Sequence, residues 1–412
     1  MRSQRVLFLT HYFYPELGAP QTRLRETARI LREMGREVRV LTGPPHYPDG
    51  HVHPGFGGML PRSDEIDGMS ITRLPMWPRP NRGVIDRTVD QASFAAVAMA
   101  AIPIVRWSDV IVIESPPLFL GITAAWYRLV ARRPYLFHVA DPWPDFPIAM
   151  GALPQRPLQA VARAIESLAY SHASMVTTVS PGLVELLAAN PAAHAKVRLL
   201  ENGVDLARFD HSVEVGAARA ALGWSANRFV IVYIGSVGLA QGVETLLDAV
   251  AQLPELEIEV HIIGEGFERD ALEVAARQRG LDHVVFSPGI HASDVPRALA
   301  AADAVLVMLR AGHLFDHSLP TKLVEGLAAG RPLIVSAGGD SARLVVDAGA
   351  GFVATPEDPS TLAEAIRDCV AATDLASRGR AARRLAETTF DRRVIVGRLA
   401  AYLDEIVAGE TQ

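Results

Sequence analysis

Short, uninterrupted apolar runs that alternate with amphipathic stretches dominate this sequence. A strand that is buried on both faces of a parallel sheet has such a continuous apolar run. Two series of runs are predicted as strands: 6–10, 37–42, 110–114, 135–139 and 175–179, then 230–234, 258–263, 284–286, 304–308 and 333–336. Helical patterns lie between them, for example at 23–34, 243–253, 267–278 and 322–329. The alternation predicts an α/β fold of parallel sheets covered by helices.

The 412 residues are too many for one ordinary core, so we expect two domains of similar size. The two series of strands divide near 202–209, and the polar, irregular stretch 210–216 is typical of a linker. We predict two doubly wound, Rossmann-like parallel-sheet domains that face one another across a cleft, residues 1–208 and 209–390, followed by a C-terminal helix in 391–412. Ligands of such sheets bind beyond the carboxyl ends of the strands.

Composition excludes several classes of protein. With 40 basic and 46 acidic residues, the net charge of −6 is not that of a nucleic-acid binder. The single cysteine, Cys369, cannot form an internal disulfide or a thiolate metal cage. Residues 1–10 are better explained by a strand than by a signal peptide.

The longest uncharged apolar stretch, 91–105, has about 15 residues, fewer than the roughly 20 that span a bilayer. Its apolar stripe and the aromatic and arginine residues after it suit an interfacial helix, and a packed core helix explains the stripe equally well. We therefore predict a cytoplasmic protein, either free or peripheral on the inner face of the cytoplasmic membrane.

Glycines follow two neighbouring strands of the second half. Gly235 and Ser236 lie between an apolar strand and a helix, and Gly264 and Gly266 repeat the arrangement after the next strand. Glycine lets backbone N–H groups approach a phosphate, and a helix N-terminus adds positive partial charge. An ordinary turn between strand and helix would contain the same glycines. Because the three-glycine dinucleotide fingerprint is absent from the sequence, a nicotinamide dehydrogenase is disfavoured.

The segment 317–332 carries the most specific pattern. Ser318 and Thr321 are both candidate helix caps, and the N–H groups of this first turn would face an anion. Lys322 adds a compact positive charge for phosphate, and Glu325, one turn later on the same face, could accept hydrogen bonds from ribose hydroxyls. The alternative is that Lys322 and Glu325 form an ordinary surface ion pair. The apolar remainder of the helix argues against this alternative.

Loops of the first half offer a second group of polar residues. Gly18 permits backbone approach after the first strand, and Arg23 is placed to meet phosphate or acceptor or, alternatively, to be a solvated helix residue. Asp141 falls just past a strand end, and Trp143 offers an apolar platform for a sugar or lipid. Asp141 and Asp145 could be mistaken for a metal pair, but without further carboxylates nearby we predict no metal.

Together these segments resemble the family 4 glycosyltransferases over essentially the whole chain. The matching residues, in order, are Tyr14-Pro15-Glu16 with Gly18, Thr178-Val179-Ser180, Asn202-Gly203-Val204-Asp205 before Phe209, Gly264-Glu265-Gly266, Ala302-Asp303, 325–332 and Gly349-Ala350-Gly351-Phe352. Further segments resemble the fucosamine and colanic-acid-type transferases of capsule and O-antigen pathways: Pro44-Pro45-His46-Tyr47-Pro48, Asp141-Pro142-Trp143-Pro144, Ala240-Gln241-Gly242 and Pro320-Thr321-Lys322.

The chain departs from the family pattern at three positions. His317 stands where the family has the first of two glutamates, and Ser236 and Gln241 stand where it has an arginine and a lysine. The loss of the arginine and the lysine would remove positive charge from the diphosphate site, and Lys322 is the obvious replacement. They bear on the identity of the donor more than on the assignment as a transferase.

The resemblance implies a GT-B fold whose last helix packs back on the first domain. It also implies a retaining, metal-independent transfer from a nucleotide-diphosphate sugar, with a UDP-sugar favoured. The implied acceptor is a polyprenyl-linked or other glycan of lipopolysaccharide or capsule synthesis. No further cofactor is expected. The transferred unit would be a hexosyl or N-acetylhexosaminyl group.

The resemblance and the loop chemistry together give three sets of site residues. The catalytic residues would be Asp141, Lys322 and Glu325. The donor would contact Gly18, Gly235, Ser236, Gly264, Gly266, Gly289, Ile290, Ser318, Pro320, Thr321, Lys322 and Glu325, with Gly289 and Ile290 near the base. The acceptor would contact Arg23, His46 and Trp143.

Two other functions stay open. A nucleotide-sugar 2-epimerase would share the paired-domain architecture but needs several convergent acids and bases, of which only Asp141 is clearly placed. A non-catalytic nucleotide-sugar-binding scaffold is suggested by His317 in place of the first glutamate. The Lys322–Glu325 pair and the Asp141 loop argue against the scaffold.

Overall fold

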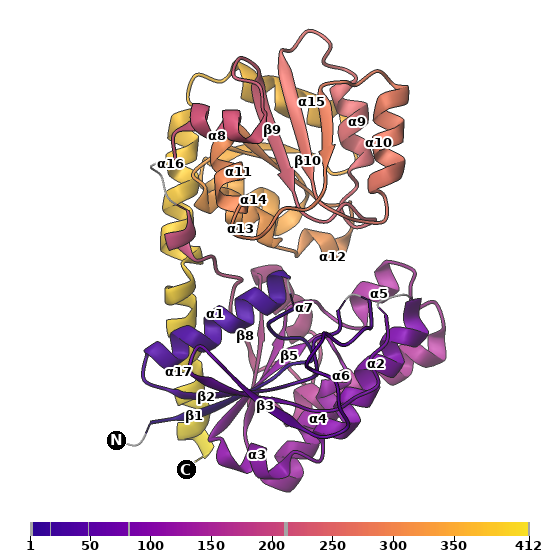
Figure 1. The fold of residues 1–412 in the computed structure, drawn as a ribbon, viewed down its shortest axis with the longest axis vertical. Helices are drawn as coiled ribbons and strands as arrows, with labels where there is room; N and C mark the ends of the chain where they lie inside the picture. The colour runs from indigo at the N-terminus through magenta and orange to yellow at the C-terminus, as the bar shows by residue number, and fades with distance from the viewer. Residues whose placement is uncertain (1–2, 17, 48, 81–82, 210–212, 411–412) are drawn as a thin grey trace. The chain divides into compact units, whose positions relative to one another are not determined.

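The computed structural model describes residues 3–16, 18–47, 49–80, 83–209 and 213–410 (Figure 1). Residues 210–212 of the predicted linker and Pro48 of the segment around His46 lie outside the described residues. The chain divides into two compact units, Met1–Glu201 with Arg393–Gln412 (unit 1) and Asn202–Arg392 (unit 2). The division therefore lies a few residues before the predicted one at 208/209.

Unit 1 contains an eight-stranded sheet with the order β3-β4-β2-β1-β5-β6-β7-β8. The strands are β1 (Arg5–Leu9), β2 (Glu37–Thr42), β3 (Arg62–Ile66), β4 (Met69–Arg73), β5 (Val110–Ser115), β6 (Tyr135–Val139), β7 (Met175–Thr178) and β8 (Val197–Leu199). All pairings are parallel except that of β3 with β4. Because β1 lies between β2 and β5, the strand order reverses there, and such a switch point is where ligands bind in sheets of this kind.

The two faces of this sheet pack against different helices. Side chains alternate along a strand, so Val6 and Phe8 of β1 join one apolar cluster and Leu7 and Leu9 join another. The first cluster includes side chains of α1 (Ala19–Glu33) and α17 (Arg392–Glu410), so the last helix packs on unit 1. The second includes side chains of α2 (Gly83–Ala98), α3 (Ile102–Trp107), α4 (Leu120–Trp126), η1 (Tyr127–Ala131), α6 (Arg156–His172) and α7 (Pro181–Ala188).

The apolar stretch 91–105 forms two helices rather than one. Helix α2 ends at Ala98, and α3 begins at Ile102 with Pro103 in its first turn. Phe94, Ala98 and Val105 are fully buried in the core. The structure therefore supports the packed-core interpretation of this stretch. Within the described ranges, no helix has both the length and the apolar character needed to cross a membrane.

Unit 2 contains a six-stranded parallel sheet with the order β11-β10-β9-β12-β13-β14. Its strands are β9 (Phe229–Ile234), β10 (Ile258–Ile263), β11 (Val284–Ser287), β12 (Ala304–Met308), β13 (Leu333–Ser336) and β14 (Gly351–Ala354). Numbered within the unit, this is the order 3-2-1-4-5-6 of dinucleotide-binding sheets, and its switch point lies between β9 and β12.

The helices of unit 2 connect these strands on both faces (Figure 1). They are α8 (Val215–Leu222), α9 (Glu244–Val250), α10 (Arg269–Gln278), α11 (Val295–Ala301), α12 (His313–Asp316), α13 (Thr321–Ala328), α14 (Gly339–Asp347), α15 (Pro359–Ala371) and α16 (Leu375–Leu385), with short turns η2 (Leu206–Arg208) and η3 (Ala386–Phe390). Each unit is thus a doubly wound α/β sheet, and the predicted fold class is confirmed.

The sequence prediction missed four strands, β3, β4, β8 and β14. Strand β3 is exposed and carries the polar sequence Arg-Ser-Asp-Glu-Ile, and β8 and β14 are short edge strands. An edge strand faces solvent along one side, so it does not need the continuous apolar run that marks a central strand.

Candidate functional site

Lys322 lies at the switch point of unit 2, in the first turn of α13. Its Nζ donates a hydrogen bond to the hydroxyl of Tyr233 and lies 4.1 Å from the centroid of that ring. The Tyr233 hydroxyl in turn donates to the backbone oxygen of Ser236, over 2.5 Å. Tyr233 is fully buried at the end of β9, so the lysine is held against the loop that follows this strand.

The surroundings of Lys322 control its charge state. Burial lowers the pKa of Lys322 to about 7, and Glu325, one turn along α13, opposes the shift. Gly235 leaves room for the lysine, because a Cβ at this position would lie 3.1 Å from its Cε and Nζ. An anion bound beside the amine would favour the charged form and raise this pKa again.

The start of α13 differs from the prediction. Pro320 occupies the N-cap position without a side-chain cap, and Thr321 is already the first helical residue. Ser318 does not cap the helix, because its Oγ donates to the oxygen of Leu314 over 3.2 Å. The capping roles predicted for Ser318 and Thr321 are therefore wrong. Ser318 instead ties the segment before α13 to α14, since its backbone oxygen accepts from Ser341 Oγ at 2.7 Å.

Close packing of two loops accounts for Gly264 and Gly266. A Cβ at Gly264 would lie 1.9 Å from the oxygen of Gly235, and one at Gly266 would lie 2.0 Å from the oxygen of Val237. The loops are joined by backbone hydrogen bonds, from Gly235 N to Ile263 O at 3.0 Å and from Val237 N to Glu265 O at 2.9 Å. The glycines thus fix the shape of the loop that holds Lys322. A direct contact of Gly264 or Gly266 with the donor stays a prediction.

The residues predicted to contact the base lie beyond β11. Gly289 is exposed, Ile290 is half-buried, and the Gly289 N–H donates to Glu265 Oε1 over 3.2 Å. The backbone donor of Gly289 therefore already has an acceptor within the protein, and a base would compete with Glu265 for it.

Arg310 is a cation at this edge that the sequence analysis missed. It follows β12, its guanidinium donates to the oxygen of Leu239, and it forms ion pairs with Glu244 and with Glu357, the latter at 2.7 Å. At the two positions where the family has cations, Ser236 and Gln241 are neutral. Since Arg310 is already paired with carboxylates, it holds this loop in place, and Lys322 is the cation nearest to Gly235. The only sequence signal for Arg310 is its position directly after a strand.

In unit 1, a charged cluster gathers where β1, β5 and β6 end. Arg23 forms an ion pair with Glu114, and the Arg23 side chain is only 16% exposed. Burial raises the pKa of Glu114 and Arg23 opposes the shift, while Asp141 adds electrostatic repulsion. The interpretation of Arg23 as a solvated residue is therefore wrong. Asp141 is exposed just after β6, near this arginine.

Glu114 was missed because it ends an apolar strand segment and shows no motif. His138, on the neighbouring strand, is buried and bonded through Nδ1 to Thr177 Oγ1 at 2.9 Å, and burial lowers its pKa well below the usual value.

Gly18 is the N-cap residue of α1, and its oxygen accepts from Thr22 N at 3.0 Å. Trp143 lies two residues after Asp141 and lines an apolar pocket.

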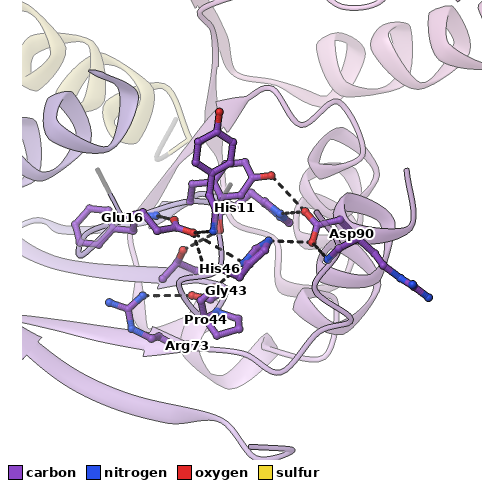
Figure 2. Close-up of polar contacts among 12 residues, drawn as sticks. His11, Glu16, Gly43, Pro44, His46, Arg73 and Asp90 are labelled. Atoms are coloured by element: carbon purple, nitrogen blue, oxygen red, sulfur yellow. Dashed lines mark hydrogen bonds and ion pairs between the residues drawn. The ribbon is translucent and has the colours of Figure 1, made fainter. Parts of the chain in front are cut away.

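A buried polar cluster joins the loops after β1 and β2 to helix α2 (Figure 2). His11 Nε2 lies 2.7 Å from Asp90 Oδ2, and His46 Nε2 lies 2.9 Å from Asp90 Oδ1. Tyr12 and the backbone of Arg79 also donate to Asp90. His46, predicted to contact the acceptor, is 2% exposed and is therefore placed to hold these loops together.

The contacts of His46 indicate that it is charged. Its Nδ1 lies 2.8 Å from the oxygen of Pro44, so this nitrogen donates, and its Nε2 lies 2.9 Å from the Asp90 carboxylate, the separation of an ion pair. Burial lowers the pKa of His46, but Asp90 outweighs it, so the pKa is raised. For His11, burial outweighs Asp90 and the pKa is lowered. Burial also opposes ionisation of Asp90, yet the two histidines hold its pKa well below the usual range.

His11, His46 and Asp90 are also the described residues whose donor atoms lie within 4.8 Å of one another and could together hold a metal ion. Two ligands that share an ion at about 2.1 Å lie about 3 Å or more apart. The separations of 2.7 and 2.9 Å are shorter and fit a proton between each pair of atoms. We therefore assign this cluster to hydrogen bonds and an ion pair.

Glu16 closes the same loops from the other side. Its carboxylate accepts from the backbone N–H groups of Phe13 at 3.2 Å, His46 at 2.8 Å and Tyr47 at 2.9 Å. The glutamate that belongs to the Tyr14-Pro15-Glu16 motif is buried and serves to fix the loops after β1 and β2.

Two halves of the chain match two family models. Residues 18–203 match the glycosyl transferase 4-like domain, and residues 215–385 match the glycosyl transferases group 1. Together with the two Rossmann-like sheets, these matches define the class. The chain belongs to the family 4 glycosyltransferases of the GT-B fold.

Individual relatives agree with this assignment. The chain is 28% identical over 337 residues to the putative colanic acid biosynthesis glycosyl transferase WcaI of Escherichia coli, an alignment that covers 79% of this chain and 81% of that protein. The structure of sucrose-phosphate synthase from Thermosynechococcus elongatus has a TM-score of 0.79 at 19% identity, over 98% of this chain and 100% of that chain. Anabaena HepE in complex with UDP-glucose has a TM-score of 0.73 at 21% identity, over 97% and 99% of the two chains.

Replacing Gly266 by alanine should destabilise unit 2. The new methyl group would meet the oxygen of Val237, which the loop cannot move without losing its hydrogen bonds, so we expect a loss of about 1–3 kcal/mol in the free energy of unfolding. Urea denaturation followed by circular dichroism measures it. Gly397→Ala is the control: nothing lies within 4 Å of its Cβ, and the helix should gain roughly 0.5–1 kcal/mol. Equal stability of Gly266→Ala and the wild type would contradict the packing role.

Replacing Asp90 by asparagine should leave the His46 charge buried without its partner. We expect a loss of about 3–5 kcal/mol in the free energy of unfolding, with Asp86→Asn on the same helix as a control of near-zero effect.

The stability lost in Asp90→Asn should depend on pH. The raised pKa of His46 gives stability that is complete below 6.5 and disappears as pH rises through the folded pKa. The lowered pKa of Asp90 gives stability that is present above 3.8 and disappears as pH falls through the folded pKa. The difference between wild type and Asp90→Asn should therefore be largest between about pH 4 and 6.5. A difference that grows above pH 8 would contradict a charged His46.

Proposed function

We propose that the chain transfers a hexosyl or N-acetylhexosaminyl unit from a nucleotide-diphosphate sugar, with a UDP-sugar favoured, to a lipid-linked saccharide in surface polysaccharide synthesis. The transfer would retain the anomeric configuration and need no metal ion. The observation that carries the proposal is the amine of Lys322, which burial has partly discharged, at the switch point of a sheet with dinucleotide-binding strand order.

The comparisons support parts of this proposal. WcaI is named for colanic acid biosynthesis, and HepE has been crystallised with UDP-glucose. WcaI is similar to this chain in sequence, and HepE is similar to it in fold. Retention and metal independence are carried over from the family resemblance.

On the donor side, Lys322 would bind the diphosphate. As the bond between C1 of the sugar and the phosphate oxygen breaks, its electron pair stays on the diphosphate, and the ammonium stabilises that charge. Glu325, on the same face of α13, would accept hydrogen bonds from the ribose hydroxyls. Lys322 and the uncapped first turn of α13 would supply the positive charge that a metal ion supplies in other transferases.

On the acceptor side, Asp141 is the proposed partner of the reacting hydroxyl. It would accept the hydroxyl proton as the new bond between C1 and the acceptor oxygen forms, on the face that the diphosphate leaves. Desolvation of the carboxyl group raises the pKa of Asp141, which suits a proton acceptor, and Arg23 opposes the shift. Glu114 anchors Arg23 there. The exposed position of Asp141 suits an acceptor that arrives from solution or from a membrane surface.

A thermal-shift panel of UDP, GDP, ADP and dTDP with a chelator present tests the donor assignment. A ligand at a hundredfold excess over Kd stabilises the protein by about 2.7 kcal/mol, which corresponds to several degrees in a unit of this size. We expect a shift with UDP that is lost in Glu325→Ala. Glu364→Ala, an exposed glutamate of α15, should keep it. No shift with any nucleotide would contradict the proposal and favour a non-catalytic scaffold.

A further inference from the structure

Unit 1 contains an apolar pocket of about 160 Å³ outside the residues used so far, except for Trp143. Helices α2, α5 (Asp145–Ala149) and α6 lie together in Figure 1 and supply most of its lining. The lining is Arg87, Thr88, Gln91, Leu118, Phe119, Trp143, Pro147, Ala152, Leu153, Leu158, Val161, Ala162 and Ile165. A cavity of about 150 Å³ with Leu, Ile and Phe walls is large enough to bind benzene.

The α6 wall of the pocket is an amphipathic stripe that the protein does not cover. Leu158, Val161, Ala162 and Ile165 recur at the spacing of one helix face. Leu158 and Val161 are 50% and 58% exposed, so the apolar surface continues from the pocket to the outside. Leucine and valine with this exposure, beside an open apolar pocket, indicate a ligand that is itself apolar.

The part of the lining that α2 supplies is polar. Helix α2 contributes Arg87, Thr88 and Gln91, and Arg87 is exposed. On α6, the exposed Arg163 is paired with Asp145 at 2.8 Å. A ligand that suits both walls has a hydrocarbon part and an anionic or polar head. This combination distinguishes an amphiphile from a purely apolar molecule.

The pocket adjoins the acceptor edge of the unit. Trp143, one of its walls, lies two residues after Asp141, the proposed partner of the reacting hydroxyl. The intervening Pro142 is buried, so the short segment between them is fixed. An acceptor whose hydroxyl meets Asp141 can therefore place a part further along its length against Trp143.

We propose that this pocket binds the hydrocarbon chain of a phosphorylated lipid acceptor, with Arg87 beside the phosphate. The proposal rests on the proposed function, whose acceptor class it specifies. The volume suits a segment of the chain near its head, and the exposed Leu158 and Val161 would contact the part that continues outward. Of the apolar stretch 91–105, Gln91 lines the pocket, whereas Phe94, Ala98 and Val105 are buried in the core.

Binding of monomeric farnesyl phosphate to the full chain, measured by isothermal titration calorimetry without detergent, tests the pocket directly. We expect binding by the wild type that is at least tenfold weaker in Val161→Glu and in Ala162→Trp, which fills the cavity. Val346→Glu, at a valine of unit 2 that is 62% exposed, is the matched control and should bind like the wild type. Inorganic phosphate should not compete.

Three results would overturn the proposal: no binding by the wild type, equal binding by all variants, or binding to phospholipid vesicles only. The nucleotide panel on the same variants separates this proposal from the proposed function, because the pocket variants should keep the UDP shift. If farnesyl phosphate binds and no nucleotide does, the pocket stands and the donor assignment fails. In transfer assays, Val161→Glu should raise KM at least tenfold for a lipid-linked acceptor and leave a tail-free acceptor unaffected.

Discussion

The burial of the Lys322 amine against Tyr233 is the constraint around which the loops of unit 2 are arranged. Gly235 leaves the space that the amine fills, and the loops after β9 and β10 pack backbone to backbone to keep that space open. Burial in turn lowers the pKa of the lysine to about 7, so the site gains most from a ligand that brings negative charge. Strand order, glycine positions and electrostatics thus converge on Lys322, where we propose that the diphosphate binds.

Unit 1 fixes its loops with buried charge of its own. Asp90 and Glu16 tie together the segments after β1 and β2, and the ion pair of Glu114 holds Arg23 near Asp141. Such groups are costly to bury unless they are paired, so their pairing makes this edge of unit 1 stiff. In the proposed function, the apolar pocket beside Trp143 gives a long acceptor a direction along this edge.

The central strands could be predicted from the sequence, because burial on both faces leaves continuous apolar runs. The family could be predicted from the order and spacing of its short motifs. The edge strand β3 could not be predicted, since its polar residues face solvent. Lys322 was found because it opens an apolar helix, whereas Glu114, Arg310 and Asp90 carry no local signal: their partners Arg23, Glu357 and His46 are distant in sequence. The glycines were found, but backbone packing as the role of Gly264 and Gly266 became visible only with the neighbouring loop in place.

Counting the protons taken up when UDP binds tests the role of Lys322 most directly. Calorimetric titrations at pH 8 in buffers of different ionisation enthalpy give this number. Because Lys322 is largely neutral at pH 8 in the free protein and charged beside a diphosphate, we predict uptake approaching one proton per UDP in the wild type and none in Lys322→Gln. UDP binding without proton uptake in the wild type would contradict the account.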